Sequence, residues 1–226
     1  MIKKIGTYYS LYSRRKRARL FNRYFPNLEG AKILDLGGGN GKLINATLPH
    51  CKNITVADIL TEDLDEAKNR FNYNTIQLDE TGILPFTKGA FDLIFCSSVI
   101  EHVTVDKDKM YDYKTNHSFA KAARVRQKLL ADEIRAKSDN YYVQTPNKYF
   151  IIESHTWLPG AIVFLPRMAQ MKVINFFNKF WPKKTAPDWN LLTRSDMQEL
   201  FPEAEIVAEK SFGLTKSLIA IRNAAL

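Results

Sequence analysis

Short apolar runs alternate with polar or helix-like stretches along most of the chain. The runs at residues 32–36, 53–57, 75–78, 91–96 and 141–144 each have the length of a strand. Strands that alternate with helical segments are typical of a parallel sheet with crossover helices. The runs at 32–36 and 91–96 are almost continuously apolar, so we expect central strands that are covered on both faces.

The end of the chain departs from this alternation. Residues 205–209 and 217–221 are two β-rich runs separated by a short connection that contains glycine, which predicts an antiparallel hairpin at the sheet edge. The pattern therefore predicts the α/β class, with a mostly parallel sheet and a C-terminal antiparallel hairpin. The length of 226 residues fits a single domain over residues 1–226.

Three further segments are predicted around the sheet. Residues 119–137 have helical composition and form the crossover into the fifth strand, whereas residues 8–25 form a basic, aromatic helix within a capping segment, 1–30. Residues 156–190 are rich in aromatic residues, Met and Pro, and form a lid-like insertion. Its apolar positions at helical spacing are Met168, Met171, Ile174, Phe177 and Trp181, widened by Val173, Phe176 and Phe180.

This insertion has two interpretations. A wide apolar helix can pack on the domain as a cover. Alternatively, it forms a surface for a lipid, a lipid-linked glycan or a membrane interface, because basic residues accompany the aromatic ones. The basic residues are Arg167, Lys172, Lys179, Lys183 and Lys184.

The strongest chemical signal is a glycine-rich turn that directly follows the first strand. The letters from Ile33 to Gly41 read ILDLGGGNG, and a helix-like stretch follows. A dinucleotide-binding G-x-G-x-x-G loop is disfavoured because Lys42 occupies the place of the third glycine. A Walker A loop is disfavoured because Leu43 replaces the hydroxyl residue that would hold magnesium.

Acidic residues accompany this loop at successive strand ends. Asp35 precedes the glycines, Asp58 follows the second strand and Asp79 follows the third. Asp58, roughly 20 residues past the loop, is placed to bind two ribose hydroxyls. Asp79 is placed to accept a hydrogen bond from an adenine amino group. A single aspartate at a strand end is often only a turn or helix cap, but three beside one glycine loop favour a nucleotide-like cofactor.

With these features, residues 31–222 resemble the class I S-adenosylmethionine-dependent methyltransferases. The stretch from Leu84 to Ile94 and the block SSVIEHV from Ser97 to Val103 carry the resemblance further. The resemblance implies a Rossmann-like, doubly wound sheet of seven strands and S-adenosylmethionine as the cofactor. The cofactor-binding residues that it implies are Asp35, Gly37, Gly38, Gly39, Asn40 and Gly41 at the methionine part, Asp58 at the ribose, Ile59, Asp79 and Glu80 at the adenine, and Ser97 and Ser98.

Within that class, the stretch from Tyr142 to Phe150 with Glu153 and His155, together with residues 192–202, resembles a bacterial subgroup that methylates small molecules or glycans. Ile151 and Ser154 stand where this subgroup has prolines. In residues 192–202, Thr193 with Asp196 predicts a helix start.

Histidines are the candidates for proton transfer if the acceptor is a hydroxyl. His102 follows the fourth strand and His155 follows the fifth, so both should lie at the cofactor edge of the sheet, whereas His50 should not. We predict His155 as the general base, with His102 either catalytic or fixing the turn. Glu153 completes the predicted catalytic set and is in reach of a hydrogen bond with His155.

Composition indicates the charge of the partner, the absence of cysteine-based sites and the expected location of the protein. The formal net charge of +9 favours an anionic partner. Cys51 and Cys96 lack the spacing of metal ligands, so no zinc site, disulfide framework or other metal is predicted. The longest apolar stretch, 157–165, is too short to span a bilayer, and no secretory signal is present, so we expect a cytoplasmic protein, with peripheral contact at the inner membrane surface as an option.

The predicted function is O-methylation of a small-molecule, sugar or lipid-linked acceptor. Two alternatives stay open: an N- or C-methyltransferase, including one that acts on RNA or a quinone precursor, and a non-catalytic S-adenosylmethionine-binding partner protein. The basic cluster at residues 14–19 allows contact with nucleic acid, although a solvated helix face is the simpler interpretation.

Overall fold

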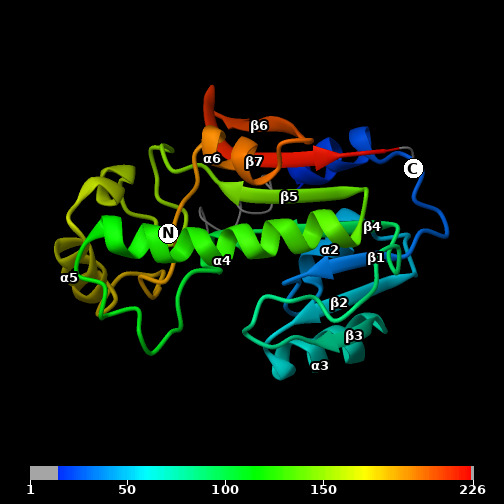
Figure 1. The fold of residues 1–226 in the computed structure, drawn as a ribbon, viewed down its shortest axis with the longest axis horizontal. Helices are drawn as coiled ribbons and strands as arrows, with labels where there is room; N and C mark the ends of the chain where they lie inside the picture. Colours follow the sequence, from blue (N-terminus) through cyan, green and yellow to red (C-terminus); the bar gives the residue numbers. More distant parts are fainter. Residues whose placement is uncertain (1–14, 225–226) are drawn as a thin grey trace.

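A seven-stranded sheet with helices on both faces forms the molecule (Figure 1). The structure is a computed structural model that describes residues 15–224. A helix over residues 15–24 comes first. The elements after it are β1 (Ile33–Leu36), α2 (Lys42–Thr47), β2 (Ile54–Asp58), α3 (Thr61–Phe71), β3 (Asn74–Gln77), β4 (Leu93–Ser97), the 3₁₀ helix η1 (Ile100–His102), α4 (Asn116–Lys137), β5 (Tyr141–Pro146), the 3₁₀ helix η2 (Gly160–Phe164), α5 (Arg167–Phe177), α6 (Arg194–Leu200), β6 (Glu205–Ser211) and β7 (Leu214–Arg222).

The strand order is β3-β2-β1-β4-β5-β7-β6. The first five strands are parallel, whereas β7 pairs antiparallel with both β5 and β6. This confirms the predicted mixed sheet, its seven strands and its C-terminal hairpin. The order reverses between β1 and β4, since the chain builds outward from β1 in one direction and then outward from β4 in the other. Ligands of doubly wound sheets bind at the carboxyl ends of the strands at this reversal.

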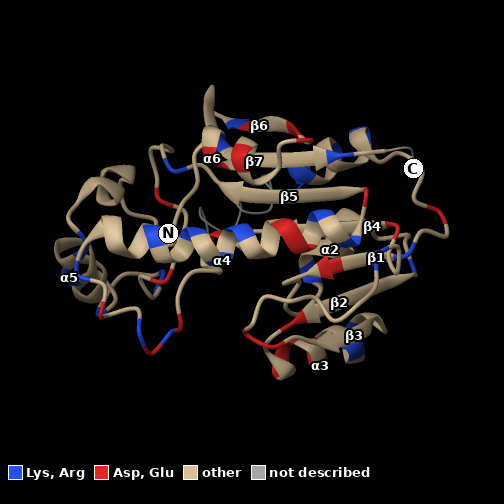
Figure 2. Ribbon diagram, viewed as in Figure 1, with Lys and Arg blue, Asp and Glu red and all other residues tan. Residues whose placement is uncertain are grey.

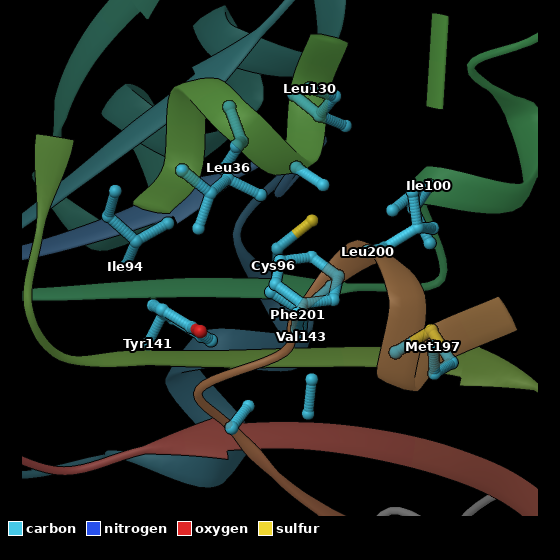
Figure 3. Close-up of a cluster of buried hydrophobic side chains, with 14 of the residues drawn as sticks. Leu36, Ile94, Cys96, Ile100, Leu130, Tyr141, Val143, Met197, Leu200 and Phe201 are labelled. Carbon is cyan, nitrogen blue, oxygen red and sulfur yellow. The ribbon is translucent and has the colours of Figure 1, made fainter. Parts of the chain in front are cut away.

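Alternating residues of the central strands supply two cores, one on each face of the sheet. Leu34, Leu36, Ile94 and Cys96 pack under α4 and α6, as Figure 3 shows for several members of this cluster. Residues of the opposite parity pack against α2, α3 and the helix over residues 15–24. Both faces of β1 and β4 are therefore apolar, which explains their nearly continuous hydrophobic sequence.

Two of the predicted helices differ from the structure at their ends. α4 begins three residues before the predicted 119, because the Thr115 side chain accepts a hydrogen bond from the Ser118 backbone N–H and so caps the helix at Thr115. α5 ends at Phe177, before the predicted 181, and Asn178 exchanges hydrogen bonds with Thr185 that turn the chain back. The predicted start of α6 is confirmed by a complete capping box between Thr193 and Asp196.

The basic cluster near the N-terminus is only partly a solvated face. Residues 1–14, including Arg14, lie outside the described residues. Arg15 and Arg19 are exposed, but Arg17 turns inward. Its guanidinium lies 3.4 Å from Glu209 Oε2 and donates to Gln144 Oε1 at 3.0 Å. The helix is thus attached to the sheet by an ion pair that sequence reasoning did not predict.

Phe21 is the apolar anchor of the same helix. It is completely buried, with its ring edge-on to Phe95 at 5.5 Å and to Tyr142 at 5.2 Å. We expect Phe21→Ala to lower the free energy of unfolding by about 3–5 kcal/mol, because it leaves a cavity between the helix and the sheet. Urea denaturation measures this change.

Phe212→Ala is the matched control, since Phe212 is 84% exposed at the turn of the terminal hairpin. Its expected effect is within about 0.5 kcal/mol. Equal stability of the two variants would contradict a packing role for the N-terminal helix.

Candidate functional site

The loops after β1 and β4 meet at the reversal of strand order. Gly37, the first residue after β1, adopts a φ of 68°. A Cβ added to Gly37 would lie 2.4 Å from a methyl carbon of Val99, which follows β4. Only glycine permits this close approach together with this backbone conformation. The glycine loop and the segment that leads into η1 are therefore adjacent walls of one site.

Asp58 holds the glycine loop in place. Its Oδ2 accepts a hydrogen bond from the Gly39 backbone N–H at 2.8 Å, and its Oδ1 accepts from the Leu60 N–H at 3.1 Å. The Leu78 N–H donates to the Asp58 carbonyl at 2.9 Å, which joins β3 to the same edge. The structure thus places Asp58 against Gly39 and Asp35 against Gly38, at the strand ends where the sequence locates both aspartates.

Asp35 is a buried carboxylate without a partner among the described residues. It is 2% exposed, and its Oδ2 receives no hydrogen bond. Burial raises the pKa of Asp35 to about 8, and the negative charge of Asp58 adds to the increase. A Cβ on Gly38 would lie 2.2 Å from this oxygen, so the bare glycine backbone leaves the carboxyl its space. A cationic or hydrogen-bond-donating ligand at the loop would satisfy this oxygen.

The other predicted cofactor residues lie along this edge with fewer contacts. Ile59 is 38% exposed beside Asp58, and Asp79 and Glu80 are exposed beyond the end of β3. Asp79 accepts hydrogen bonds from the backbone and hydroxyl of Thr81, which lower its pKa. Asn40 donates to Glu66 at 3.1 Å and is directed toward α3. No contact of the described residues joins Asp79 or Glu80 to the glycines.

Ser97 and Ser98 belong to a polar cluster at the ends of β4 and β5. Both hydroxyls donate to Gln144 Oε1, at 2.6 Å and 3.2 Å, and Arg17 donates to the same oxygen. Ser98 has a φ of 62°, which is uncommon outside glycine. Sequence reasoning missed Gln144 and Arg17. The polar residue inside the apolar run 141–144 was the available signal for Gln144.

His155 lies in a network of carboxylates beyond the end of β5. Its Nδ1 is 2.7 Å from Glu153 Oε1, and its Nε2 is 3.7 Å from Glu101 Oε1. Glu153 also accepts the backbone N–H groups of His155 and Thr156, at 2.8 Å and 2.6 Å. Burial lowers the pKa of His155, but the neighbouring carboxylates of Glu101 and Glu153 outweigh this and raise it to about 9.

His102 reaches the same network from the end of η1. Its ring lies edge-on to the His155 ring, with 4.7 Å between centroids, and its Nδ1 is 3.3 Å from Asp188 Oδ1. Trp189 stacks on the other side of His155 at 5.4 Å. The structure therefore brings His102, His155 and Glu153 together at the strand edge, as predicted. Glu101, Asp188 and Trp189 were missed, since Asp188 and Trp189 are remote in sequence.

The lid-like insertion carries its apolar surface on two sides of α5. Met171 and Ile174 are buried, but Met168, Phe176 and Phe180 are exposed, so the helix is only half covered. Two of the predicted surface cations are not on the surface. Arg167 is 2% exposed and lies over the Phe119 ring at 3.7 Å, whereas Lys183 donates to the Ser154 carbonyl. Figure 2 shows that Lys and Arg, and no Asp or Glu, occur along α5.

Comparison with known proteins gives the class of the site. Residues 34–127 match the family model described as "Methyltransferase domain". A stretch of 85 residues is 34% identical to a ubiquinone biosynthesis O-methyltransferase of Actinobacillus pleuropneumoniae serotype 7 (strain AP76), and it covers 34% of this chain. The match spans only about a third, 36%, of that relative's length.

Solved structures share the fold at low sequence identity. The magnesium protoporphyrin IX methyltransferase of Synechocystis PCC 6803, with bound SAH, has a TM-score of 0.53 at 14% identity, over 95% of this chain and 84% of that one. The PH0226 protein of Pyrococcus horikoshii OT3 has a TM-score of 0.55 at 14% identity, over 92% of this chain and 90% of that one.

Residues 34–127 thus match a methyltransferase domain, and the seven-stranded sheet has the fold of solved methyltransferases. The domain implies S-adenosylmethionine as the cofactor. The site fits this molecule, because Asp35 offers an unpartnered oxygen at a glycine loop that side chains would fill. Within residues 15–224, none of the helices has the length and apolar character that crossing a membrane requires.

Asp35→Asn is expected to stabilise the protein in the absence of cofactor, increasingly as the pH rises from about 4 to 8. The pKa of Asp35 is about 8 in the folded chain but about 3.9 in an unfolded one. Only the folded state keeps the proton in this window, so stability falls as the pH rises through it. Asparagine does not ionise and removes this loss. Thermal melting of both proteins between about pH 5 and 9 measures the difference.

The matched control is Asp65→Asn, an exposed position on α3. Its melting temperature should differ from that of the parent by the same small amount at every pH. An Asp35→Asn difference that does not grow with pH would contradict the cost of ionising this buried carboxyl.

Proposed function

We propose that the protein transfers the methyl group of S-adenosylmethionine to the oxygen of a small-molecule, sugar or lipid-linked acceptor. One observation carries the proposal: a glycine loop with an unpartnered buried carboxyl oxygen adjoins a cluster of histidines and carboxylates, in which Glu101, Glu153 and His155 are buried. The Val99 side chain occupies the position that a Cβ on Gly37 would take, and Glu101 lies two residues after Val99. A cofactor half and a proton-handling half thus share one edge of the sheet.

The cofactor half has a role for each predicted residue. Asp35 and the loop from Gly37 to Gly41 would hold the methionine part, Asp58 the ribose hydroxyls and Ile59 the adenine face. Asp79, Glu80, Ser97 and Ser98 would complete the site at its edges. When bound, S-adenosylmethionine supplies an electrophilic methyl carbon on a sulfonium. The task of the protein is then to hold the acceptor atom about 3–3.5 Å from this carbon, aligned and away from water.

The acceptor half favours a hydroxyl. A hydroxyl must lose its proton in the reaction, and a cluster of imidazole and carboxylate groups can take part in that loss. A neutral amine already has a free electron pair and needs this cluster less. The Actinobacillus pleuropneumoniae relative, a ubiquinone biosynthesis O-methyltransferase, supports the same choice. His155 and His102 are the proposed catalytic residues, whereas Glu153 positions His155 through Nδ1.

Loss of Asp58 should weaken cofactor binding. We expect Asp58→Ala to lower the affinity for S-adenosylmethionine and its demethylated product by about 10–100-fold. Hydrogen bonds to a charged group contribute about 1.5–3 kcal/mol, and each 1.4 kcal/mol or so corresponds to a factor of ten. Isothermal titration calorimetry measures this, with Asp65→Ala on the exposed face of α3 as the control. A binding heat with NAD and none with S-adenosylmethionine would contradict the proposed methyltransferase activity.

The acceptor is identified by incubating the protein and S-adenosylmethionine that carries a radiolabelled methyl group with sugar nucleotides, quinone precursors, lipid extracts or RNA. The measurement is the label transferred to each of them. The expected result is label in a sugar, lipid or other small molecule. His155→Ala should lose this transfer and keep its cofactor affinity. Label in RNA, or on nitrogen or carbon, would replace O-methylation with one of the alternatives named above.

We also propose that the exposed side of α5 contacts an anionic membrane surface. Met168, Lys172 and Phe176 recur every four residues, so they share one face of the helix. Phe180 continues this stripe, with its ring 5.3 Å from that of Phe176. Phe176 and Phe180 are 56% and 62% exposed. Aromatic residues with lysines on an interfacial helix are typical of attachment to anionic lipids.

The charge of the segment supports this contact. Lys172, Lys179 and Lys184 are exposed, and the sequence has no acidic residue between Glu153 and Asp188. α5 lies at the end of the molecule toward which β5 points, so a lipid-linked acceptor would approach from the side of the candidate site (Figure 1).

Replacing Phe176 and Phe180 together with serine should weaken vesicle binding at least tenfold. Full burial of one phenylalanine contributes about 1.5–3 kcal/mol. Co-sedimentation with phosphatidylcholine vesicles, with and without phosphatidylglycerol, measures the effect, and the parent should bind only the anionic vesicles. Phe212→Ser, on the terminal hairpin, is the matched control and should bind like the parent. Equal binding by the parent and the double variant would contradict this surface.

A further inference from the structure

We infer that Glu101, His102 and His155 form a binding site for a divalent transition-metal ion at the acceptor side of the site. One ligand atom from each residue lies within 4.8 Å of the other two. Glu101 Oε1 and His155 Nε2 are 3.7 Å apart. Neighbouring ligands of a tetrahedral metal with bonds of about 2.1 Å are separated by roughly 3.4 Å. The three side chains therefore need shifts of only a fraction of an ångström up to about one.

Glu101 supplies an oxygen that has no hydrogen-bond donor. Its residue is completely buried. Oε2 accepts from the Thr145 hydroxyl at 3.0 Å, whereas Oε1 receives no hydrogen bond among the described residues. Burying a charged oxygen is costly unless a cation or donors compensate it. This oxygen lies 3.7 Å from His155 Nε2, which makes it the carboxylate ligand that we infer for an ion at this cluster.

Both histidines are held by carboxylates through Nδ1. His155 Nδ1 is 2.7 Å from Glu153, and His102 Nδ1 is 3.3 Å from Asp188. With Nδ1 hydrogen-bonded to a carboxylate, Nε2 is the ring nitrogen that a metal would take, and the metal displaces any proton on it. Metal-binding histidines are oriented in this way, by a carboxylate on the opposite ring nitrogen. The two rings come from different loops, and each has its own orienting partner.

The surroundings fix these partners in turn. Backbone N–H groups of His155 and Thr156 hold Glu153. The Thr104 hydroxyl donates to the Asp188 carbonyl at 2.6 Å, and the Asn190 N–H donates to the Glu101 carbonyl at 2.8 Å. The ligand atoms are thus set by packed loops and not by free surface side chains.

The ligand set indicates which ions would bind. Two imidazole nitrogens and one carboxylate oxygen suit borderline ions such as Zn²⁺, Mn²⁺ and Fe²⁺, whereas Ca²⁺ and Mg²⁺ favour sites made of oxygen. Three protein ligands leave at least one coordination position for another molecule. His102 is exposed, so this position is reached from solvent.

An ion here would act on the acceptor, and this part of the inference rests on the proposed function. An acceptor hydroxyl bound to the ion has a lowered pKa. Its O–H bond breaks, the proton goes to solvent water and the electron pair stays on the oxygen. That pair then forms the bond to the methyl carbon as the carbon–sulfur bond breaks, and the bonding pair of the latter remains on the sulfur.

Calorimetric titration of the EDTA-treated full chain with MnCl₂ and with ZnCl₂ tests the site, together with the electron paramagnetic resonance signal of free Mn²⁺. We expect one equivalent of ion to bind. His102→Ala, Glu101→Gln and Asp188→Asn should each bind at least tenfold more weakly. His50→Ala, at an exposed position after α2, is the control and should bind like the parent. Circular dichroism checks that each variant is folded, and His102 is the safest position because it is exposed.

Absence of binding by the parent, or parent-like binding by both His102→Ala and Glu101→Gln, would overturn the metal site. Titration with S-adenosylmethionine in EDTA separates this result from the proposed function. Cofactor binding without metal binding would leave the methyltransferase proposal standing and remove the ion. Metal binding without cofactor binding would do the reverse. Methyl transfer that is equally fast in EDTA and in Mn²⁺ would remove the catalytic part of the inference.

Discussion

The cost of burying carboxylates organises this site. Asp35, Glu101 and Glu153 are all nearly inaccessible to water, at the carboxyl ends of β1, β4 and β5. A buried carboxylate requires hydrogen bonds or an opposite charge. Both carboxylate oxygens of Glu153 accept hydrogen bonds, whereas only one oxygen of Glu101 does so within residues 15–224. Asp35 Oδ2 has none among the described residues. The carboxyl oxygens that accept no hydrogen bond within this part of the chain are the ones that a ligand would satisfy.

The sheet makes this arrangement possible. Parallel strands end at one edge, so short loops that leave them place their polar groups together. Two apolar cores hold β1 and β4 from both faces, and the close approach of Gly37 and Val99 joins the loops that follow these two strands. The residues proposed to hold the cofactor and those proposed to act on the acceptor thereby follow the ends of the same packed strands.

The sequence predicted the parts of this picture that depend on local order. Strands appear as apolar runs, and Asp58 stands out because it ends one of them beside a glycine loop. His102 and His155 were placed at the site for the same reason. Asp188 could not be found in this way, because its partner His102 is 86 positions away and only the folded insertion brings it there. Glu101 stands beside His102 in sequence, but its burial and its unpartnered oxygen are properties of packing.

The insertion was harder to predict for a physical reason. Helical periodicity shows that α5 has a broad apolar surface, but it does not show which part of that surface is covered. The structure buries Met171 and Ile174 and leaves Phe176 exposed. It also turns Arg167 inward, where burial lowers the pKa of the guanidinium to about 10. A charge count on the sequence treats this residue as part of a basic surface, and its contact with the Phe119 ring shows that it is structural.

Arg167 also connects the two proposed surfaces. Its guanidinium donates to the Pro187 carbonyl at 2.6 Å, next to the residue that orients His102. Trp189, one residue after Asp188, stacks on His155. Any contact that moves α5 therefore acts on a segment whose neighbouring residues hold both histidines. A lid that binds lipid through Phe176 would be linked through Arg167 and residues 187–189 to the position of the imidazoles. The insertion would then be part of the proposed acceptor site and not only its cover.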